Sequence, residues 1–186
     1  VSRRLLADDM FDGWGIRTLS SQNGAYAPLM YQRGSVWPHD NALIAFGMKR
    51  YNHWQEANRI AEGIFSASGL FAHGRLPELW AGLGRAETHW PVLYPKANVP
   101  QAWAAGSVPL LLRAILGLEP DASQRCLLLQ PTLPPWLDEL TIERMPFAGE
   151  TVDLHLQGTG PETKVEVLRT SGSITVEHRP IRKEAA

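Results

Sequence analysis

The sequence predicts a mainly α-helical fold that ends in a small antiparallel β segment. Before residue 120, three long stretches place apolar residues at three- and four-residue spacing, which is typical of amphipathic helices. After residue 120, the chain breaks into short β-prone runs separated by Gly and Pro, as in a sheet with tight connections. The chain has 186 residues, of which 44% are hydrophobic, and is therefore long enough to bury a core.

The first third of the chain predicts two helices separated by a loop. Residues 2–10 predict a short helix, and a loop with three Gly and one Pro follows over residues 12–30. A longer helix is expected over residues 38–51. Pro38 suits its first turn, and Asp40 lies near the positive end of the helix dipole.

The clearest amphipathic helix is expected over residues 54–68 and ends at Gly69. Asn52 and Gln55 have the spacing of a capping box at its start. A further strong helix is expected over residues 100–116, where Pro opens the helix and Gly follows it.

Residues 70–99 show no sustained periodicity and predict a long loop between helices, which in compact domains is usually functional. The β-prone runs lie at residues 126–129, 140–143, 151–157, 163–169 and 173–178. We therefore expect a helical part over residues 1–120, a β region over 121–180 and a flexible tail over 181–186.

Charge and composition exclude several classes of partner. The 18 basic and 19 acidic residues nearly cancel without a basic run, so neither nucleic acid nor a membrane surface is expected as a partner. The His residues are scattered and the Gly residues form no phosphate loop, so no metal and no cofactor is expected. A single Cys, Cys126, and the lack of a signal-peptide pattern favour a reducing, cytoplasmic location.

The densest cluster of chemistry-bearing residues is Tyr31, Arg33, Trp37, His39 and Asp40, which converge on an expected helix start. Such a start presents free backbone amides and a focused electric field. For any single member the alternative is ordinary, because Tyr31 and Trp37 could pack the core and Asp40 could cap the helix. For the cluster as a whole, the pattern favours a pocket.

A second cluster centres on Glu78, which stands between Pro77 and Leu79. Apolar neighbours would desolvate this carboxyl group and raise its pKa, which suits general acid or base chemistry. The alternative is a loop glutamate that forms a salt bridge with Arg75 or Arg85.

Two further clusters place aromatic rings beside hydrogen-bond donors. Residues 13–18 contain Trp14 and Arg17, and residues 90–103 end in Gln101 and Trp103. Sugars stack on such rings, although core packing is the commoner use of Trp.

Four motifs in order resemble the C-terminal half of bacterial proteins related to glycogen-debranching enzymes. These amylo-α-1,6-glucosidase-like proteins belong to the six-hairpin glycosidase superfamily. The motifs are GWGIRTLS at residues 13–20, GSVWPHDNA at 34–42, RLPEL at 75–79 and PQAWAAGS at 100–107. The closing segment from residue 118 onward also resembles this family, so the resemblance covers essentially the whole chain.

The resemblance implies a partial (α/α)6 toroid of helical hairpins whose loops form a sugar pocket at one end. It also implies hydrolysis of an α-glucosidic linkage with inversion by two carboxylates. Glu78 matches the position of the general base. Twelve toroid helices do not fit into 120 residues, so the early hairpins and the general acid are expected upstream, and the isolated chain is expected to be inactive.

The resemblance implies that the sugar is held by Tyr31, Arg33, Trp37, His39 and Asp40. Gln101, Trp103, Trp14 and Arg17 are expected as further contributors. The sequence departs from many relatives where Gln32 and Arg33 replace His-Asn and where Lys96 replaces a small or apolar residue. The expected partner is an oligosaccharide or polysaccharide. The alternative is a non-catalytic carbohydrate-binding or structural fragment that self-associates through exposed helix faces.

Overall fold

A computed structural model describes residues 1–181 of the chain. The remaining residues, 182–186, which make up all but the first residue of the predicted tail, lie outside the described part. The helices are α1 (Ser2–Leu5), α2 (Pro38–Arg50), α3 (Trp54–Ser68), α4 (Arg85–Thr88), α5 (Ala102–Leu116) and the 3-10 turn η1 (Ala72–Gly74). The strands are β1 (Glu119–Asp121), β2 (Cys126–Leu129), β3 (Glu139–Phe147), β4 (Glu150–Gln157), β5 (Lys164–Thr170) and β6 (Thr175–His178).

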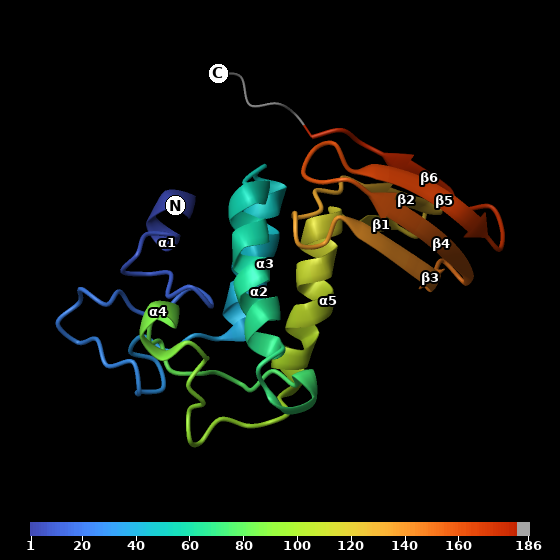
Figure 1. The fold of residues 1–186 in the computed structure, drawn as a ribbon. Coiled ribbons are helices and arrows are strands. Elements are labelled where there is room, and N and C mark those ends of the chain that lie inside the picture. The colour runs from blue at the N-terminus through green and yellow to red at the C-terminus, as the bar shows by residue number, and fades with distance from the viewer. Residues whose placement is uncertain (182–186) are drawn as a thin grey trace. The chain divides into compact units, whose positions relative to one another are not determined.

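The predicted mainly α-helical fold with a partial toroid is wrong, because the chain is a mixed α and β protein. Helices account for 30% of the chain and strands in two small sheets for 24%. A toroid needs a succession of helical hairpins, whereas α1 and α4 are single turns of 4 residues each. Within residues 1–181, one hairpin of long helices is formed, by α2 and α3, which lie side by side (Figure 1).

The chain divides into two compact units, Val1–Leu112 and Arg113–Ala186, and the division falls within α5. The core of the first unit is built on α3, whose apolar stripe is almost fully buried. Its buried apolar residues are Ala57, Ile60, Ala61, Ile64 and Ala67. Burying one Ile side chain contributes roughly 1.5–3 kcal/mol, so this stripe is the main reason that α3 is helical where it is.

Close packing of α3 also fixes one of the preceding loops. At Gly63 the backbone of Trp14 comes so near that a Cβ atom would stand 2.4 Å from the Trp14 carbonyl oxygen. Only glycine allows this approach in the middle of the helix. The loop that carries Trp14 is therefore held directly against α3.

Backbone bridges tie together the segments that the sequence predicted as loops. Arg17 bridges Val36, Val36 bridges Trp80, and Trp80 bridges Leu93, all in the antiparallel sense. The Val36 amide donates to the Trp80 carbonyl at 2.9 Å, and the Trp80 amide donates back at 3.0 Å. Residues 12–36 and 76–93 thus form one cross-linked layer around the start of α2.

The second unit contains two three-stranded sheets. One has the order β1-β2-β6, in which β2 pairs antiparallel with β1 and parallel with β6. The other is an antiparallel meander of β3, β4 and β5. The predicted purely antiparallel segment is therefore wrong at the β2–β6 pair.

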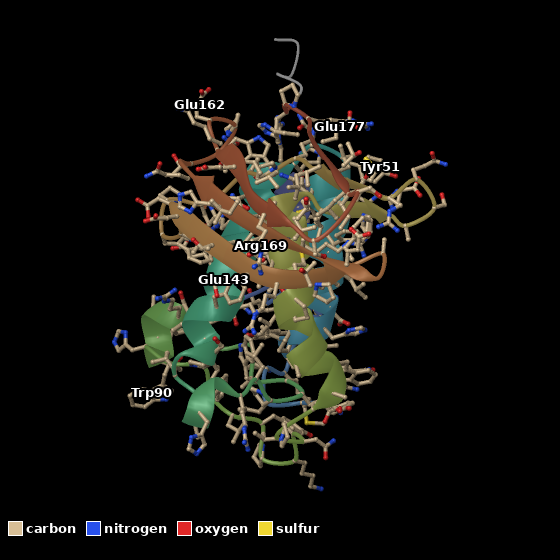
Figure 2. The ribbon with its side chains drawn as sticks, turned by 90° about the vertical axis from the view of Figure 1, so that its right-hand side faces the viewer. Tyr51, Trp90, Glu143, Glu162, Arg169 and Glu177 are labelled. Atoms are coloured by element: carbon tan, nitrogen blue, oxygen red, sulfur yellow. The ribbon has the colours of Figure 1, made fainter. Side chains whose placement is uncertain are left out.

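The strands of the second unit bury one set of side chains and expose another. In β4, Val152, Leu154 and Leu156 are fully buried at alternate positions. On the opposite face of β4, Asp153 pairs with Arg169 of β5 at 3.2 Å. Figure 2 labels Arg169.

Among residues 1–181, no helix combines the length and apolar character needed to cross a membrane.

Candidate functional site

An open cavity of about 470 Å³ lies in the first unit, at the start of α2. It is lined by Thr18, Tyr31, Gln32, Trp37, His39, Asp40 and Trp103. Three separate segments supply this lining: the loop before α2, the first turn of α2 and the first turn of α5. The structure thus brings together five residues that the sequence suggested for sugar binding, and adds Thr18 and Gln32.

Asn41 fixes the geometry at the start of α2. Its Oδ1 accepts a hydrogen bond from the Ile16 amide at 2.7 Å, and its Nδ2 donates to the Ile16 and Trp37 carbonyls at 3.2 and 2.9 Å. The side chain is fully buried, so these bonds are shielded from water. Asn41 therefore holds the 13–17 segment against the first turn of α2 beside the cavity.

Aromatic rings form a continuous band along the cavity. Tyr31 lies edge-on to Trp37 at 4.9 Å and tilted to Tyr94 at 5.8 Å. Trp103 meets Trp37 at 6.2 Å and stacks on His39 at 5.3 Å, with 17° between the planes. Tyr31 and Trp103 are 41% and 45% exposed, whereas Trp37 is buried, so the first two rings are the ones that a ligand can reach.

Glu78 is buried, with 4% of its surface exposed, and receives hydrogen bonds on both carboxylate oxygens. The Tyr31 hydroxyl donates to Oε1 at 2.5 Å. The Asn98 side chain and backbone amide donate to Oε2 at 2.9 and 3.3 Å. The Glu78 amide in turn donates to the Asn98 carbonyl at 2.9 Å, which fixes the loop on which the carboxylate stands.

The Tyr31 hydrogen bond, aided by the Asn98 amides, lowers the pKa of Glu78 below its ordinary value. Burial alone would raise this pKa, as expected from the sequence, but the donors outweigh burial. The direction predicted from the apolar neighbours is therefore wrong. Glu78 is an ionised carboxylate at neutral pH, which suits a base and not an acid.

The alternative of a salt bridge to Arg75 or Arg85 does not describe this structure. Among residues 1–181, no ion pair involves Glu78. The Arg85 guanidinium instead lies 4.1 Å from the centre of the Trp14 ring. Neutral donors hold Glu78, so no cation among these residues neutralises its charge.

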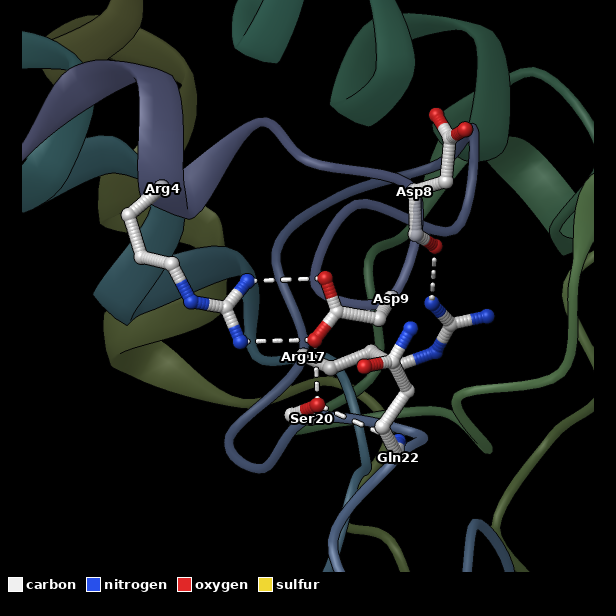
Figure 3. A network of polar contacts seen from close by, with 6 residues as sticks. All are labelled: Arg4, Asp8, Asp9, Arg17, Ser20 and Gln22. Atoms are coloured by element: carbon white, nitrogen blue, oxygen red, sulfur yellow. Dashed lines mark hydrogen bonds and ion pairs between the residues drawn. The ribbon is translucent and has the colours of Figure 1, made fainter.

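Trp14 and Arg17 lie away from the cavity. Trp14 is 1% exposed beneath Arg85, so its ring packs in the core. Arg17 is buried, and its Nε donates to the Gly82 carbonyl at 2.7 Å. Its Nη1 donates to the Asp8 carbonyl at 3.2 Å (Figure 3). Both side chains join loops together.

A second polar network beside Arg17 fixes the same loops (Figure 3). Arg4 donates to both carboxylate oxygens of Asp9, at 2.8 and 2.6 Å, and Ser20 also donates to Asp9. The hydrogen bond from Arg4, followed in size of effect by the one from Ser20, lowers the pKa of Asp9 to about 2. Asp9 is therefore charged over the whole physiological range and joins the N-terminal turn to the 12–30 loop.

Arg33 and Gln101 also do not line the cavity. Arg33 is exposed, and its carbonyl accepts from the Ala27 amide at 2.7 Å to close the loop. Gln101 is half-buried, and its side-chain oxygen accepts from the Ala102 amide at 2.9 Å at the start of α5. Gln101 therefore shapes the helix start that presents Trp103.

Sequence reasoning missed Asn98, because nothing in its local pattern separates it from the rest of the long loop. Gln32 was noted as a departure from the family pattern, and Thr18 lies in a quoted motif, but neither was proposed to line a cavity.

Within residues 1–181, no group of His, Cys, Asp or Glu is arranged to hold a metal ion. The comparisons add no family, since no protein-family model and no curated protein matches the chain.

Proposed function

We propose that the first unit is part of an inverting glycoside hydrolase that acts on α-glucosidic linkages, with Glu78 as the general base. The observation that carries this proposal is the setting of Glu78. A buried carboxylate is kept ionised by the neutral donors Tyr31 and Asn98, next to a cavity with exposed aromatic rings. The sequence motifs that resemble amylo-α-1,6-glucosidases support the same proposal.

The chemistry asked of Glu78 is to take a proton from water as the water attacks the anomeric carbon. A carboxylate offers about four acceptor sites on its two oxygens. Asn98 donates twice to Oε2, and Tyr31 donates once to Oε1. A water molecule would therefore bind at the remaining site on Oε1. The proposal assigns the general acid to no residue of this chain, so the chain alone binds glucosides without hydrolysing them.

The cavity suits a glucosyl unit by its mixture of groups. The exposed rings of Tyr31 and Trp103 offer flat apolar faces to the C–H faces of a sugar. Gln32, His39 and Asp40 line the same cavity and offer donors and acceptors to sugar hydroxyls. Asp40 also stands in the first turn of α2.

Binding is tested by calorimetry of maltose and panose with the whole chain. Trp103→Ala removes one exposed ring and should weaken binding roughly 2- to 10-fold, the value of one aromatic contact. Trp90→Ala is the matched control. Trp90 is 62% exposed but does not line the cavity, so its removal should leave affinity unchanged (Figure 2). Equal losses in the two variants, or no heat with either sugar, would contradict sugar binding here.

The catalytic role is tested in a full-length member of the amylo-α-1,6-glucosidase-like family that the motifs resemble, by replacing the glutamate that corresponds to Glu78 with Gln. This change keeps the shape of the side chain and removes the negative charge. Turnover should be abolished while binding of maltose is retained, because the charge acts on water. Undiminished turnover would overturn the assignment of Glu78.

A non-catalytic carbohydrate-binding module is the second candidate, and one observation favours it. Glu78 is 4% exposed and is not among the residues that line the cavity. In that case the chain binds maltose, and the Gln variant of the relative keeps both binding and turnover. The two experiments together therefore separate the candidates.

A further inference from the structure

We propose that Tyr31 is a positioning residue that links the cavity to Glu78. Its ring forms part of the wall against which a sugar lies, and its hydroxyl fixes Oε1 of the carboxylate. This inference rests on the proposed function. It goes further by naming the residue through which an occupied cavity acts on the base.

Among the described residues, Tyr31 is the one that both lines the cavity and hydrogen-bonds to Glu78. It lines the cavity, whereas Glu78 does not, and it donates the 2.5 Å hydrogen bond to Glu78 Oε1. The ring of Tyr31 forms part of the cavity wall, and its hydroxyl contacts the carboxylate. A ligand that contacts the ring therefore contacts the same side chain that hydrogen-bonds to the carboxylate.

The backbone and ring of Tyr31 are held from several sides. Its carbonyl accepts from Ser35 Oγ at 2.6 Å and from Trp37 Nε1 at 3.3 Å. Its ring contacts Trp37 and Tyr94 at 4.9 and 5.8 Å. Because these contacts restrict the ring, the hydroxyl meets Oε1 in a defined direction and not as a freely rotating donor.

The hydroxyl also shares Oε1 with the proposed water site. Both hydrogen bonds from Asn98 fall on Oε2, so Tyr31 is the described group that orients Oε1. The contact with Glu78 raises the pKa of Tyr31 above its ordinary value. The phenol consequently stays protonated and remains a donor throughout the range in which Glu78 titrates.

The first test measures Glu78 in the whole 186-residue chain without ligand. Side-chain carboxyl carbons are labelled with 13C, and Glu78→Gln identifies the Glu78 resonance. Tyr31→Phe keeps the ring and removes the donor, so the titration midpoint of Glu78 should rise. Tyr94→Phe is the control, because Tyr94 touches the Tyr31 ring but makes no hydrogen bond to Glu78, and its midpoint should equal that of the parent. A midpoint unchanged in Tyr31→Phe would overturn the inference, whatever the chain binds.

The second test adds maltose at pH 7 and follows the same resonance. The Glu78 signal should move in the parent chain and in Tyr94→Phe, and should move much less in Tyr31→Phe. If maltose binds and the signal moves equally in all three proteins, Tyr31 does not link the cavity to Glu78. If calorimetry detects no maltose binding, the proposed function fails, and the ligand-free titration alone decides whether Tyr31 positions Glu78.

Discussion

Asp12 is a buried acid in the loop that carries Trp14. Its Oδ1 accepts hydrogen bonds from the Trp14 and Gly15 amides, both at 2.8 Å. Its Oδ2 is buried without a hydrogen-bond partner among residues 1–181. Burial raises the pKa of Asp12 to about 6, although the two amides and nearby Arg17 oppose this effect.

The raised pKa of Asp12 predicts that the chain loses stability as the pH rises. The folded state binds this proton more tightly than the unfolded state, whose pKa is 3.8. The stabilisation is complete below pH 3.8 and is lost as the pH rises through about 6. With about 1.4 kcal/mol per pKa unit, the loss amounts to roughly 3 kcal/mol.

Urea unfolding of the parent and Asp12→Asn at pH 4.5 and pH 8 measures this effect. The Asn side chain keeps the oxygen that accepts from the two amides and cannot ionise. The free energy of unfolding of Asp12→Asn, relative to that of the parent, should therefore increase between the two pH values. A constant difference for Asp12→Asn would mean that the pKa of Asp12 is the same in the folded and unfolded states.

For single residues, the sequence indicated which side chains can do chemistry or stack on a sugar. It did not indicate their burial or their hydrogen-bond partners. Glu78 stood out because of its apolar neighbours, but its donors Tyr31 and Asn98 lie 47 and 20 positions away. No local pattern could reveal that these donors would lower its pKa. Trp14 looked like Trp103 in sequence, since both stand in short motifs with small residues. Only tertiary packing made one a core residue and the other an exposed ring.

Two glycines within long helices give opposite predictions. In α2, a Cβ on Gly47 would meet nothing within 4 Å, so Gly47→Ala should stabilise the protein by about 0.5–1 kcal/mol through helix propensity. In α3, the same change at Gly63 places the Cβ 2.4 Å from the Trp14 carbonyl oxygen. Gly63→Ala should therefore destabilise, despite the same gain in propensity.

Thermal unfolding of the two alanine variants tests this contrast. The melting temperature of Gly47→Ala should exceed that of the parent, and that of Gly63→Ala should lie below it. Equal increases in both would show that the 13–17 segment moves away from α3 without cost.

The long helices and most strands followed from local patterns. Helices expected over residues 38–51, 54–68 and 100–116 occur within two residues of those bounds, because their apolar stripes coincide with the buried faces. The capping box expected from Asn52 and Gln55 is wrong. Asn52 adopts a left-handed backbone with φ 67°, and α3 begins after His53 without a side-chain cap.

The two compact units predict separate responses to core damage. Ile60 of α3 and Leu154 of β4 are fully buried in different units. Truncation of either to alanine should cost about 2–5 kcal/mol through lost burial and a cavity. Hydrogen exchange resolved by residue should show faster exchange in α2 and α3 for Ile60→Ala. For Leu154→Ala, the faster exchange should occur in β3, β4 and β5. Acceleration in both units by either variant would mean that the chain unfolds as one cooperative body.

The whole fold was the least predictable level. Helical periodicity over three segments suggested repeated hairpins, and the family resemblance turned this into a toroid. Residues 12–36 and 76–93 instead form a layer of isolated backbone bridges, which leave no periodic apolar signal. The parallel pairing of β2 with β6 joins segments about 50 residues apart, and no local turn pattern indicates such a pairing.

The exposed indole of Trp103 gives the cavity an optical property. Its ring stacks on His39 at 5.3 Å, and 45% of the residue is exposed. A sugar that covers the ring would remove water from it and change the wavelength of its fluorescence emission. The chain has seven Trp residues, so the signal of Trp103 is the difference between the emission of the parent and that of Trp103→Ala. The cavity therefore contains an intrinsic fluorophore, and its occupancy can be followed without any added label.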